Sequence, residues 1–343
     1  MLKSLKYILF IRGDIISIFS KSLLEREDFE RILFITLSSL GDTIMTLPVF
    51  FELENLFPKA QFDILVGERS KEIFLTLPNV DEVFLYTSEN RGIKGKIPLI
   101  KDISKKKYDL VIDLRHSILP IFVRSKQKIF TTFKPKIPGI HATEEHLRNI
   151  FHKDAENFKF DYSDKIIINN KTIIKFGDVL DRILGSVGIV PGATWQPKAY
   201  RIDGFVEASK MLRNKGLNLV LLGSSDEVGL CDEISKEVES LNLCGKTSLM
   251  DLFYIIKNLS ALVTNDSGPM HIASLLNIPT VALFGPSDER RYRPWGKRYK
   301  VLMHKEICRE CLYQGCDKGG KCMNLITPDE IVDATINLIG ALI

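Results

Sequence analysis

Along most of the chain, short apolar runs take turns with longer segments in which apolar residues recur at helical spacing. Short apolar runs that end in loops of small and polar residues predict buried strands, and the segments between them carry apolar residues at helical spacing. The apolar runs are residues 31–36, 61–66, 83–86, 108–114, 186–190, 217–222, 241–244, 261–263 and 279–284. Helices are expected up to residue 56 after the first run, and at residues 71–77, 203–215, 249–258, 269–277 and 328–342. Strands that alternate with helices predict an α/β protein with parallel sheets.

The pattern occurs twice, which predicts two doubly wound domains in a chain of 343 residues. We place the first domain at residues 30–170 and the second at 171–343, with the connection within residues 165–185. Packing of the last helix back on the first domain is an open alternative. Residues 94–107 form a basic helix or loop, and residues 125–170 show no clear period.

Residues 1–29 are an N-terminal amphipathic extension, for which we predict a helix. Its apolar face is made by Ile8, Ile11, Ile15 and Phe19, and its polar positions include Lys3, Lys6, Arg12 and Lys21. Two interpretations stay open: a helix lying on a membrane surface, and an extra helix packed on the domain. Arg12 and Asp14 interrupt the apolar region, and no small-residue cleavage site follows, so we expect no signal peptide and a cytoplasmic chain.

Composition narrows the classes of partner. Hydrophobic residues make up 45% and charged residues 26%, as in globular proteins, and no apolar stretch is long enough to span a bilayer. The net charge of +4 is too small to indicate nucleic acid. It suits a negatively charged small ligand or an anionic membrane surface, so peripheral contact with the cytoplasmic face of the inner membrane stays open.

Four of the six cysteines crowd into one segment with the spacing C-x2-C-x4-C-x5-C: Cys308, Cys311, Cys316 and Cys322. One C-x2-C pair supports zinc, but the other spacings do not form a second such pair. We favour reduced thiols over a structural zinc site in a reducing compartment.

The loop at residues 264–269 is the clearest candidate for chemistry. It follows an apolar run and opens a helix, so it offers backbone N–H groups and the positive end of a helix dipole to an anion. Asp266 and Ser267 can cap that helix or contact a ligand, and Met270 and His271 lie in its first turn.

Three further features lie in loops that follow apolar runs of the first domain. Asp42 stands in a small-residue loop before a helix, where it acts as a helix cap or as a catalytic carboxylate. Arg115 and His116 follow residues 108–114 and are candidates for binding an anionic substrate, with a solvated loop as the alternative. Arg69 is a weaker candidate of the same kind.

Several motifs are absent. No G-x-G-x-x-G follows a strand, so a dinucleotide cofactor is disfavoured, and no G-x-S-x-G marks a serine hydrolase. Gly245-Lys246-Thr247 resembles the end of a phosphate-binding P-loop, but Ser240 stands where the first glycine belongs. No Asp-x-Asp stands in a plausible loop, which favours a reaction that needs no cation.

Taken together, the motifs resemble those of the ADP-heptose:lipopolysaccharide heptosyltransferases, which are inverting glycosyltransferases of family 9. The resemblance spans about residues 30–340. It rests on the segments Thr36–Asp42 with Leu47-Pro48, Pro191-Gly192-Ala193 with Lys198, Asn265–Ala273, Leu283–Pro286 and the late cysteines.

The resemblance implies a GT-B fold, in which two Rossmann-like domains face each other across a cleft. The nucleotide-sugar donor would sit mainly on the second domain and an anionic glycolipid acceptor on the first, with no cofactor and no metal. It implies that Asp42 is the general base that deprotonates the acceptor hydroxyl. The donor-binding residues would be Thr194, Lys198, Glu227, Thr247, Asp266, Ser267, Gly268 and His271, and the acceptor-binding residues Ser39, Gly41, Arg69, Arg115 and His116.

The chain also departs from the family pattern. Tyr200-Arg201 stands where many members have Trp-Pro, Ala193 stands where some carry a second threonine, and residues 1–29 have no counterpart. The expected function is transfer of a heptose to the inner core of lipopolysaccharide. Two alternatives are a transferase of the same fold that uses another nucleotide sugar for a different surface glycan, and a non-catalytic protein that binds nucleotide sugars.

Overall fold

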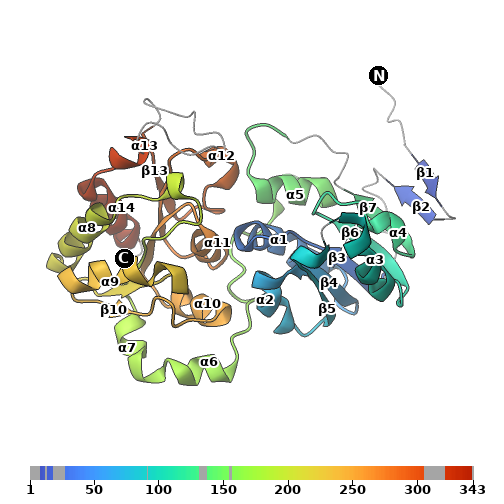
Figure 1. Ribbon diagram of the computed structural model, residues 1–343, viewed down its shortest axis with the longest axis horizontal. Helices are drawn as coiled ribbons and strands as arrows, with labels where there is room; N and C mark the ends of the chain where they lie inside the picture. The colour runs from blue at the N-terminus through green and yellow to red at the C-terminus, as the bar shows by residue number, and fades with distance from the viewer. Residues whose placement is uncertain are drawn as a thin grey trace. The chain divides into compact units, whose positions relative to one another are not determined.

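The computed structural model describes residues 8–11, 14–17, 28–90, 92–130, 137–153, 157–304 and 321–341, with the backbone alone for residues 8–11, 14–17 and 93. The chain forms two compact units, Met1–Lys159 and Phe160–Ile343 (Figure 1). The division comes before the boundary at residue 170 expected from the sequence, because residues 160–163 contact the second unit. The rings of Phe160 and Trp295 lie 5.0 Å apart, and the Tyr162 N–H donates to the Leu275 carbonyl over 3.1 Å.

The first unit contains a seven-stranded sheet and five α-helices among its described residues. Its strands are β1 (Ile8–Ile11), β2 (Asp14–Ser17), β3 (Arg31–Ile35), β4 (Gln61–Gly67), β5 (Val80–Tyr86), β6 (Tyr108–Asp113) and β7 (Ser125–Phe130). Its helices are α1 (Leu40–Leu56), α2 (Lys71–Leu75), α3 (Gly92–Ile103), α4 (Leu119–Phe122) and α5 (Ala142–Phe151). The strand order is β1-β2-β7-β6-β3-β4-β5, and every neighbouring pair except β1 and β2 is parallel.

The helix predicted in the N-terminal extension is wrong where the structure describes it. β1 and β2 form an antiparallel hairpin in which Ile8 pairs with Ser17, and β2 joins the sheet beside β7 through Ile15 and Gln127. β-Branched isoleucines dominate both segments, and such residues favour strands. Residues 1–7, 12–13 and 18–27 lie outside the described part of the chain, and the interpretation as a membrane-surface helix loses its basis at residues 8–17.

The faces of the first sheet are covered by different helices. On one face, Phe50 of α1 contacts the rings of Phe34, Phe62 and Phe74 at centroid distances of 5.0 to 5.7 Å. Side chains of α3 and α4 pack on the other face against Leu33, Ile35 and Leu65. Because neighbouring residues of a strand point to opposite faces, Phe34 and its neighbours Leu33 and Ile35 serve different layers.

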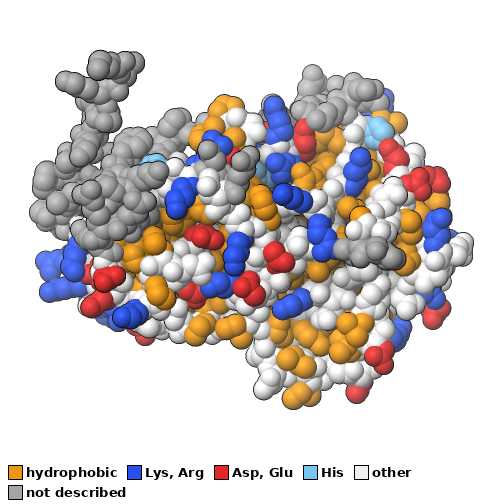
Figure 2. Space-filling view, turned by 180° about the vertical axis from the view of Figure 1, so that it is seen from behind, with side chains coloured by type: hydrophobic (Ala, Val, Ile, Leu, Met, Phe, Trp, Pro, Cys, Tyr) orange, Lys and Arg blue, Asp and Glu red, His pale blue; other side chains and the backbone are white. Residues whose placement is uncertain are grey.

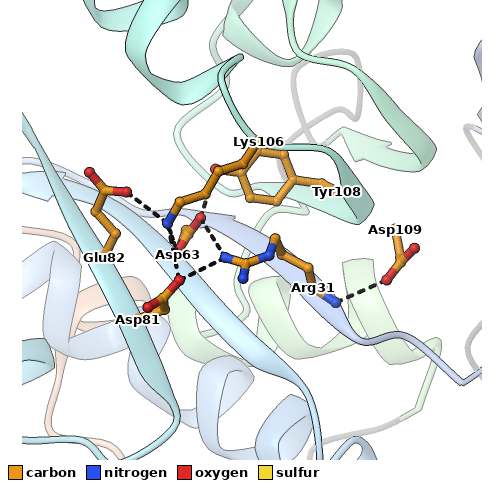
Figure 3. A network of polar contacts seen from close by, with 7 residues as sticks. All are labelled: Arg31, Asp63, Asp81, Glu82, Lys106, Tyr108 and Asp109. Atoms are coloured by element: carbon orange, nitrogen blue, oxygen red, sulfur yellow. Dashed lines mark hydrogen bonds and ion pairs between the residues drawn. The ribbon is translucent and has the colours of Figure 1, made fainter.

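A network of charged side chains closes the amino edge of this sheet, the edge at which β3, β4, β5 and β6 begin (Figure 3). Asp63 of β4 is fully buried and accepts from Tyr108 Oη at 2.8 Å, Lys106 Nζ at 3.1 Å and Arg31 Nη1 at 3.5 Å. Asp81 accepts from Arg31 Nη1 at 2.8 Å and from Lys106 at 3.1 Å, and the hydrogen bond from Arg31 lowers the pKa of Asp81. Burial, aided by the charge of Asp63, raises the pKa of Tyr108, so its hydroxyl remains a donor.

The second unit contains a six-stranded sheet among its described residues, with the order β10-β9-β8-β11-β12-β13, and all its neighbouring pairs are parallel. Its strands are β8 (Val187–Val190), β9 (Leu219–Leu221), β10 (Leu241–Asn242), β11 (Ala261–Asn265), β12 (Thr280–Leu283) and β13 (Tyr299–Leu302). Its helices are α6 (Asn170–Lys175), α7 (Leu180–Ile183), α8 (Ile202–Asn214), α9 (Val228–Glu237), α10 (Leu249–Lys257), α11 (Gly268–Leu275), α12 (Glu289–Tyr292), α13 (Lys321–Asn324) and α14 (Pro328–Gly340).

The last helix, α14, packs within the second unit. Its residues Ile331 and Val332 are buried in one core with Phe205 of α8 and with Val263 and Val281 of the sheet. The alternative that this helix packs back on the first domain is therefore corrected. The two sheets, parallel in every neighbouring pair except β1 and β2, and their flanking helices confirm the predicted pair of Rossmann-like α/β folds. No helix in the described part of the chain is both long enough and apolar enough to cross a membrane.

Candidate functional site

The strand order of the first unit has a switch point between β3 and β6. From β3 the chain continues through β4 and β5 in one direction, whereas β6 and β7 extend the sheet in the other. Ile35 pairs with Asp113, so the loops after β3 and β6 leave from neighbouring positions. In open α/β sheets, ligands bind beyond the carboxyl ends of the strands at such a point. Ser39, Gly41, Asp42, Arg69, Arg115 and His116 all follow strands of this carboxyl edge.

Asp42 lies in the first turn of α1, so it is not the N-cap residue that the sequence allowed it to be. Ser39 is the N-cap residue: its Oγ accepts from the Asp42 N–H at 3.2 Å and donates to Asp42 Oδ2 at 2.6 Å. The carboxyl group is half-buried, and Ser39 is its only hydrogen-bond partner among the described residues. One carboxylate oxygen is thus held and the other, Oδ1, is left to accept a proton or a hydrogen bond.

Gly67 at the end of β4 keeps this loop in place, a role that the sequence analysis missed. A Cβ atom at residue 67 would come within 2.5 Å of the Ser38 carbonyl oxygen, so any larger residue would displace the backbone before Ser39. Arg69 follows directly in an exposed position, at the same edge of the sheet as Asp42. Gly41 is half-buried in the first turn of α1.

Asp113, the last residue of β6, organises the loop that carries Arg115 and His116. Its fully buried carboxylate accepts from Arg115 N at 2.8 Å, from Ser117 N at 2.8 Å and from Ser117 Oγ at 3.1 Å. Burial raises the pKa of Asp113 to about 6, although these hydrogen bonds and His116 act in the opposite direction. The turn also places His116 at a φ of 58°, in the left-handed region. The sequence analysis did not single out Asp113; its position at the end of an apolar run was the available signal.

Arg115 brings a cation to the same edge. Its guanidinium lies over the Tyr86 ring at the end of β5, with Cζ 3.6 Å from the centroid. Its Nη1 is buried and has no hydrogen-bond partner, and burial lowers the pKa of Arg115 against the opposing effects of Tyr86 and Asp113. A buried N–H donor without an acceptor is costly, so this nitrogen is suited to receive an anionic group from a ligand. His116 is exposed at the surface of the loop.

The second unit repeats this arrangement with a switch point between β8 and β11. The predicted donor-binding residues fall in loops at the carboxyl edge of its sheet. Thr194 and Lys198 follow β8, Glu227 follows β9, and Thr247 follows β10. Asp266, Ser267, Gly268 and His271 follow β11. The structure therefore gathers the predicted acceptor residues at one edge in the first unit and the predicted donor residues at one edge in the second.

Asn265, which the sequence motif contains but to which we assigned no role, joins the two loops at this second switch point. Its fully buried side chain donates through Nδ2 to the Pro191 carbonyl at 2.8 Å and to the Gly192 carbonyl at 3.2 Å. Its Oδ1 accepts from the Tyr200 N–H at 3.1 Å. The loop that carries Thr194 and Lys198 is thus fixed at both ends to the end of β11.

Lys198 meets Asp266 across the switch point. Lys198 Nζ and Asp266 Oδ2 are 2.7 Å apart, with side chains 27% and 5% exposed. The contact is an ion pair without hydrogen-bond geometry, since Asp266 Oδ2 has no hydrogen-bond partner. Lys198 lies close enough to the surface to contact an anionic ligand from its place beside Asp266.

The N-terminus of α11 faces the same place. Ser267 is its N-cap residue, but its side chain bonds to Thr264 Oγ1 at 3.0 Å and caps no helix N–H. The first-turn N–H groups other than that of Pro269, which has none, and the helix dipole therefore remain available to an anion. His271 is buried within this helix, and Gly268 and Ser267 are half-buried.

Glu227 lies against the loop after β8. Its Oε2 accepts from Ser224 N at 2.6 Å and Ser224 Oγ at 2.9 Å, which forms a capping box. A Cβ atom at residue 192 would overlap the Glu227 carboxyl group, so Gly192 permits this close contact. Thr194 is exposed and Thr247 half-buried, both within loops of the carboxyl edge.

The described residues contain no group of three or more His, Cys, Asp or Glu side chains that could hold a metal ion. Cys308, Cys311 and Cys316 lie outside the described residues, so the expectation for the cysteine segment stays a prediction. Cys322 is buried, and its Sγ would lie 3.3 Å from a Cβ atom at residue 285, which places it beside the loop after β12.

Comparison with known proteins agrees with this geometry. Residues 157–321 match the family model described as glycosyltransferase family 9 (heptosyltransferase). Lipooligosaccharide heptosyltransferase 2 of Campylobacter jejuni is 28% identical over 88% of this chain and 95% of its own length. Lipopolysaccharide heptosyltransferase 3 of Escherichia coli is 25% identical over 87% of this chain and 95% of its own length.

Solved structures share the fold. The glycosyl transferase family 9 protein of Veillonella parvula superimposes with a TM-score of 0.76 at 19% identity, over 92% of this chain and 99% of that one. ADP-heptose lps heptosyltransferase II of E. coli gives a TM-score of 0.68 at 21% identity, over 91% and 99%. Two Rossmann-like units and these structural neighbours identify the GT-B fold, as predicted. The chain is similar to glycosyltransferase family 9, the heptosyltransferase family, in residues 157–321 by the family model and over most of its length by the curated relatives.

Proposed function

We propose that this chain transfers a heptose from ADP-heptose to the inner core of lipopolysaccharide, with inversion and without a metal ion. The observation that carries the proposal is Asp42, a carboxylate fixed at the switch point of the first unit with one oxygen unengaged. The names of the relatives support the substrates, since they are lipooligosaccharide and lipopolysaccharide heptosyltransferases.

Asp42 acts as the general base in this proposal. Ser39 orients the carboxylate through a hydrogen bond to Oδ2. The other oxygen takes the proton of the acceptor hydroxyl as that hydroxyl attacks the anomeric carbon. Attack on the side opposite to the leaving ADP inverts the configuration at that carbon.

The second unit holds the donor. Negative charge develops on the diphosphate as ADP leaves, and Lys198 with the N–H groups that open α11 stabilises that charge where it forms. In this proposal Lys198 is paired with Asp266 when no donor is bound, and it contacts the diphosphate when the donor binds. Thr194, Glu227 and Thr247 contact the rest of the nucleotide sugar.

The first unit holds the acceptor through cations. Arg115 Nη1, buried without a partner, receives an anionic group of the glycolipid, and Arg69 and His116 add positive charge or hydrogen bonds at the same edge. We place the reaction on the cytoplasmic side of the inner membrane, where Cys231 and Cys244 remain free thiols.

The test is ADP release by the full-length chain with ADP-heptose and a core acceptor. Asp42→Asn is expected to lower kcat by about 10²- to 10⁴-fold while ADP binding by calorimetry is unchanged. Glu68→Gln is the matched control, because it removes an exposed carboxylate from the same edge. Full turnover in Asp42→Asn would remove the assigned base. Preference for a UDP-linked sugar in calorimetry would instead favour a different nucleotide-sugar donor.

A further inference from the structure

Positive charge is concentrated in one part of the chain. Residues 91–143 contain thirteen lysines and arginines against three aspartates, although the whole chain has a net charge of only +4. The remainder of the chain is therefore net negative. The described part of this segment forms α3, β6, α4 and β7 of the first unit.

The helices α3 and α4 bring part of this charge to one surface. Both pack on the same face of the sheet, α3 through Leu99 and Ile103 and α4 through Leu119, with Val123 directly after the helix. Their ends lie side by side, since Ser104 Oγ donates to the Phe122 carbonyl at 3.5 Å. The side chains on the opposite side of these helices consequently point away from the core together.

Large apolar side chains stand among these outward positions. Ile97 of α3 is 58% exposed, and Ile118 and Phe122, four residues apart at α4, are 47% and 51% exposed. Four cations accompany them in exposed positions and form no ion pair within the described residues: Lys94, Lys101, Lys107 and Arg124. We call these seven residues the α3–α4 surface.

A second apolar patch provides the contrast. Figure 2 shows hydrophobic side chains gathered over the segment of α6 and α7, where Ile173, Ile174 and Leu184 are 44%, 78% and 50% exposed. Residues 165–184 carry four lysines and arginines together with two aspartates. That patch is apolar without a comparable excess of positive charge.

We propose that the α3–α4 surface docks the protein on a bilayer of anionic lipids. The exposed Ile97, Ile118 and Phe122 enter the boundary between headgroups and acyl chains, and the unpaired cations meet lipid phosphates. Neither contribution alone gives stable attachment, whereas an apolar anchor combined with a basic cluster does. The bound occupant is a lipid surface, because exposed apolar side chains beside cations without ion pairs among the described residues complement acyl chains and anionic headgroups together.

Docking is tested with the full-length chain and no substrate, so the result is independent of the proposed function. Sedimentation with vesicles of phosphatidylcholine and phosphatidylglycerol should bring down the protein, whereas vesicles of phosphatidylcholine alone should bring down much less. The triple variant Lys94→Glu, Lys101→Glu, Arg124→Glu is expected to bind anionic vesicles at least about a hundredfold more weakly. The double variant Ile97→Ser, Phe122→Ser is expected to lose about tenfold.

Matched controls separate this surface from general charge and apolarity. The charge control makes the same change of charge with three exposed lysines of the second unit: Lys171→Glu, Lys215→Glu, Lys236→Glu. The apolar control removes the other exposed apolar pair: Ile173→Ser, Ile174→Ser. Both controls should bind anionic vesicles as the wild type does. Equal binding by the α3–α4 variants and the wild type, or equal losses in the controls, would overturn the proposal. Transfer to a detergent-dispersed acceptor should be unchanged in all four variants.

Discussion

The charged residues at the two edges of the first sheet differ in how many hydrogen-bond partners they have. At the amino edge, Asp63 accepts from three donors and Asp81 from two, so both of these carboxylates have several partners. At the carboxyl edge, Asp42 is held by Ser39 alone, and Arg115 has a buried nitrogen with no partner. At one edge of the sheet, Asp63 and Asp81 are paired with several donors. At the other edge, Asp42 and Arg115 have atoms without a hydrogen-bond partner in the described part of the chain.

The difference indicates that charged residues at the amino edge stabilise the fold, whereas those at the carboxyl edge are available to bind a ligand. The charged groups around the buried Asp63 satisfy one another and link the starts of β3, β4, β5 and β6, so they are not available to a ligand. Groups left with an open position are costly in the empty protein and gain a partner when a substrate binds. The second unit lies between these cases, because Lys198 is paired with Asp266 but lies near the surface.

The largest effect is expected at the amino edge. Asp63→Asn leaves Arg31, Lys106 and Tyr108 facing a neutral amide and should lower the free energy of unfolding by about 3–5 kcal/mol. Urea denaturation measures this change. Asp102→Asn, at an exposed ion pair with Lys105, is the control and should change stability little. The turnover of folded Asp63→Asn protein should match the wild type. A loss of turnover without a loss of stability would contradict the assignment of a purely structural role to the amino edge.

The second unit should respond at the chemical step. Lys198→Ala removes the cation assigned to the leaving diphosphate, and kcat should fall by about 10²- to 10³-fold. The variant also leaves the buried Asp266 without its cation, so its unfolding must be measured alongside its kinetics. Lys215→Ala, at an exposed lysine, is the control. A change confined to stability would show that Lys198 is structural.

A smaller effect is expected from the pH dependence of Asp113. Burial raises its pKa from 3.8 to about 6, so the folded chain keeps a proton that the unfolded chain has already lost between these pH values. The free energy of unfolding should therefore fall with rising pH across that interval, by roughly 3 kcal/mol. Urea denaturation at pH 4.5 and at pH 6.5 should show less of this fall in Asp113→Asn than in the wild type. Identical pH dependence in both proteins would contradict the assignment.

The smallest effect concerns Arg115. Removing it in Arg115→Ala should raise the KM for the acceptor by about tenfold to a hundredfold, because one charged hydrogen bond to an anionic group is lost. The KM for ADP-heptose should be unchanged. Arg124→Ala provides an exposed cation as control. An effect on the donor alone would move Arg115 out of the acceptor site.

The sequence predicted much of this arrangement because most strands are apolar runs that end in small polar loops. The sequence analysis missed β7, because the residues of this strand (SKQKIF) are mostly polar and do not form an apolar run. Lys128 of β7 is nevertheless only 1% exposed, because neighbouring elements of the fold cover the strand. The sequence analysis also assigned a helix to residues that form β1 and β2, because the spacing of isoleucines fits one helical face as well as a hairpin.

The candidate site shows the same limit. The motif around Asp266 and the loop of Asp42 are local in sequence and could be found by inspection. The contact of Arg115 with Tyr86 joins the ends of β6 and β5, and the bonds from Asn265 join β11 to the loop after β8. Such partners follow from strand order, which no local pattern specifies.

The most direct test is a crossed measurement on Asp42→Asn and Asp63→Asn, two identical chemical changes at opposite edges of one sheet. Turnover and the free energy of unfolding are measured for both variants and for the wild type. We predict that Asp42→Asn loses turnover and keeps its stability, while Asp63→Asn loses stability and keeps turnover per folded molecule. Turnover retained in Asp42→Asn, or lost equally in both variants, would contradict the account.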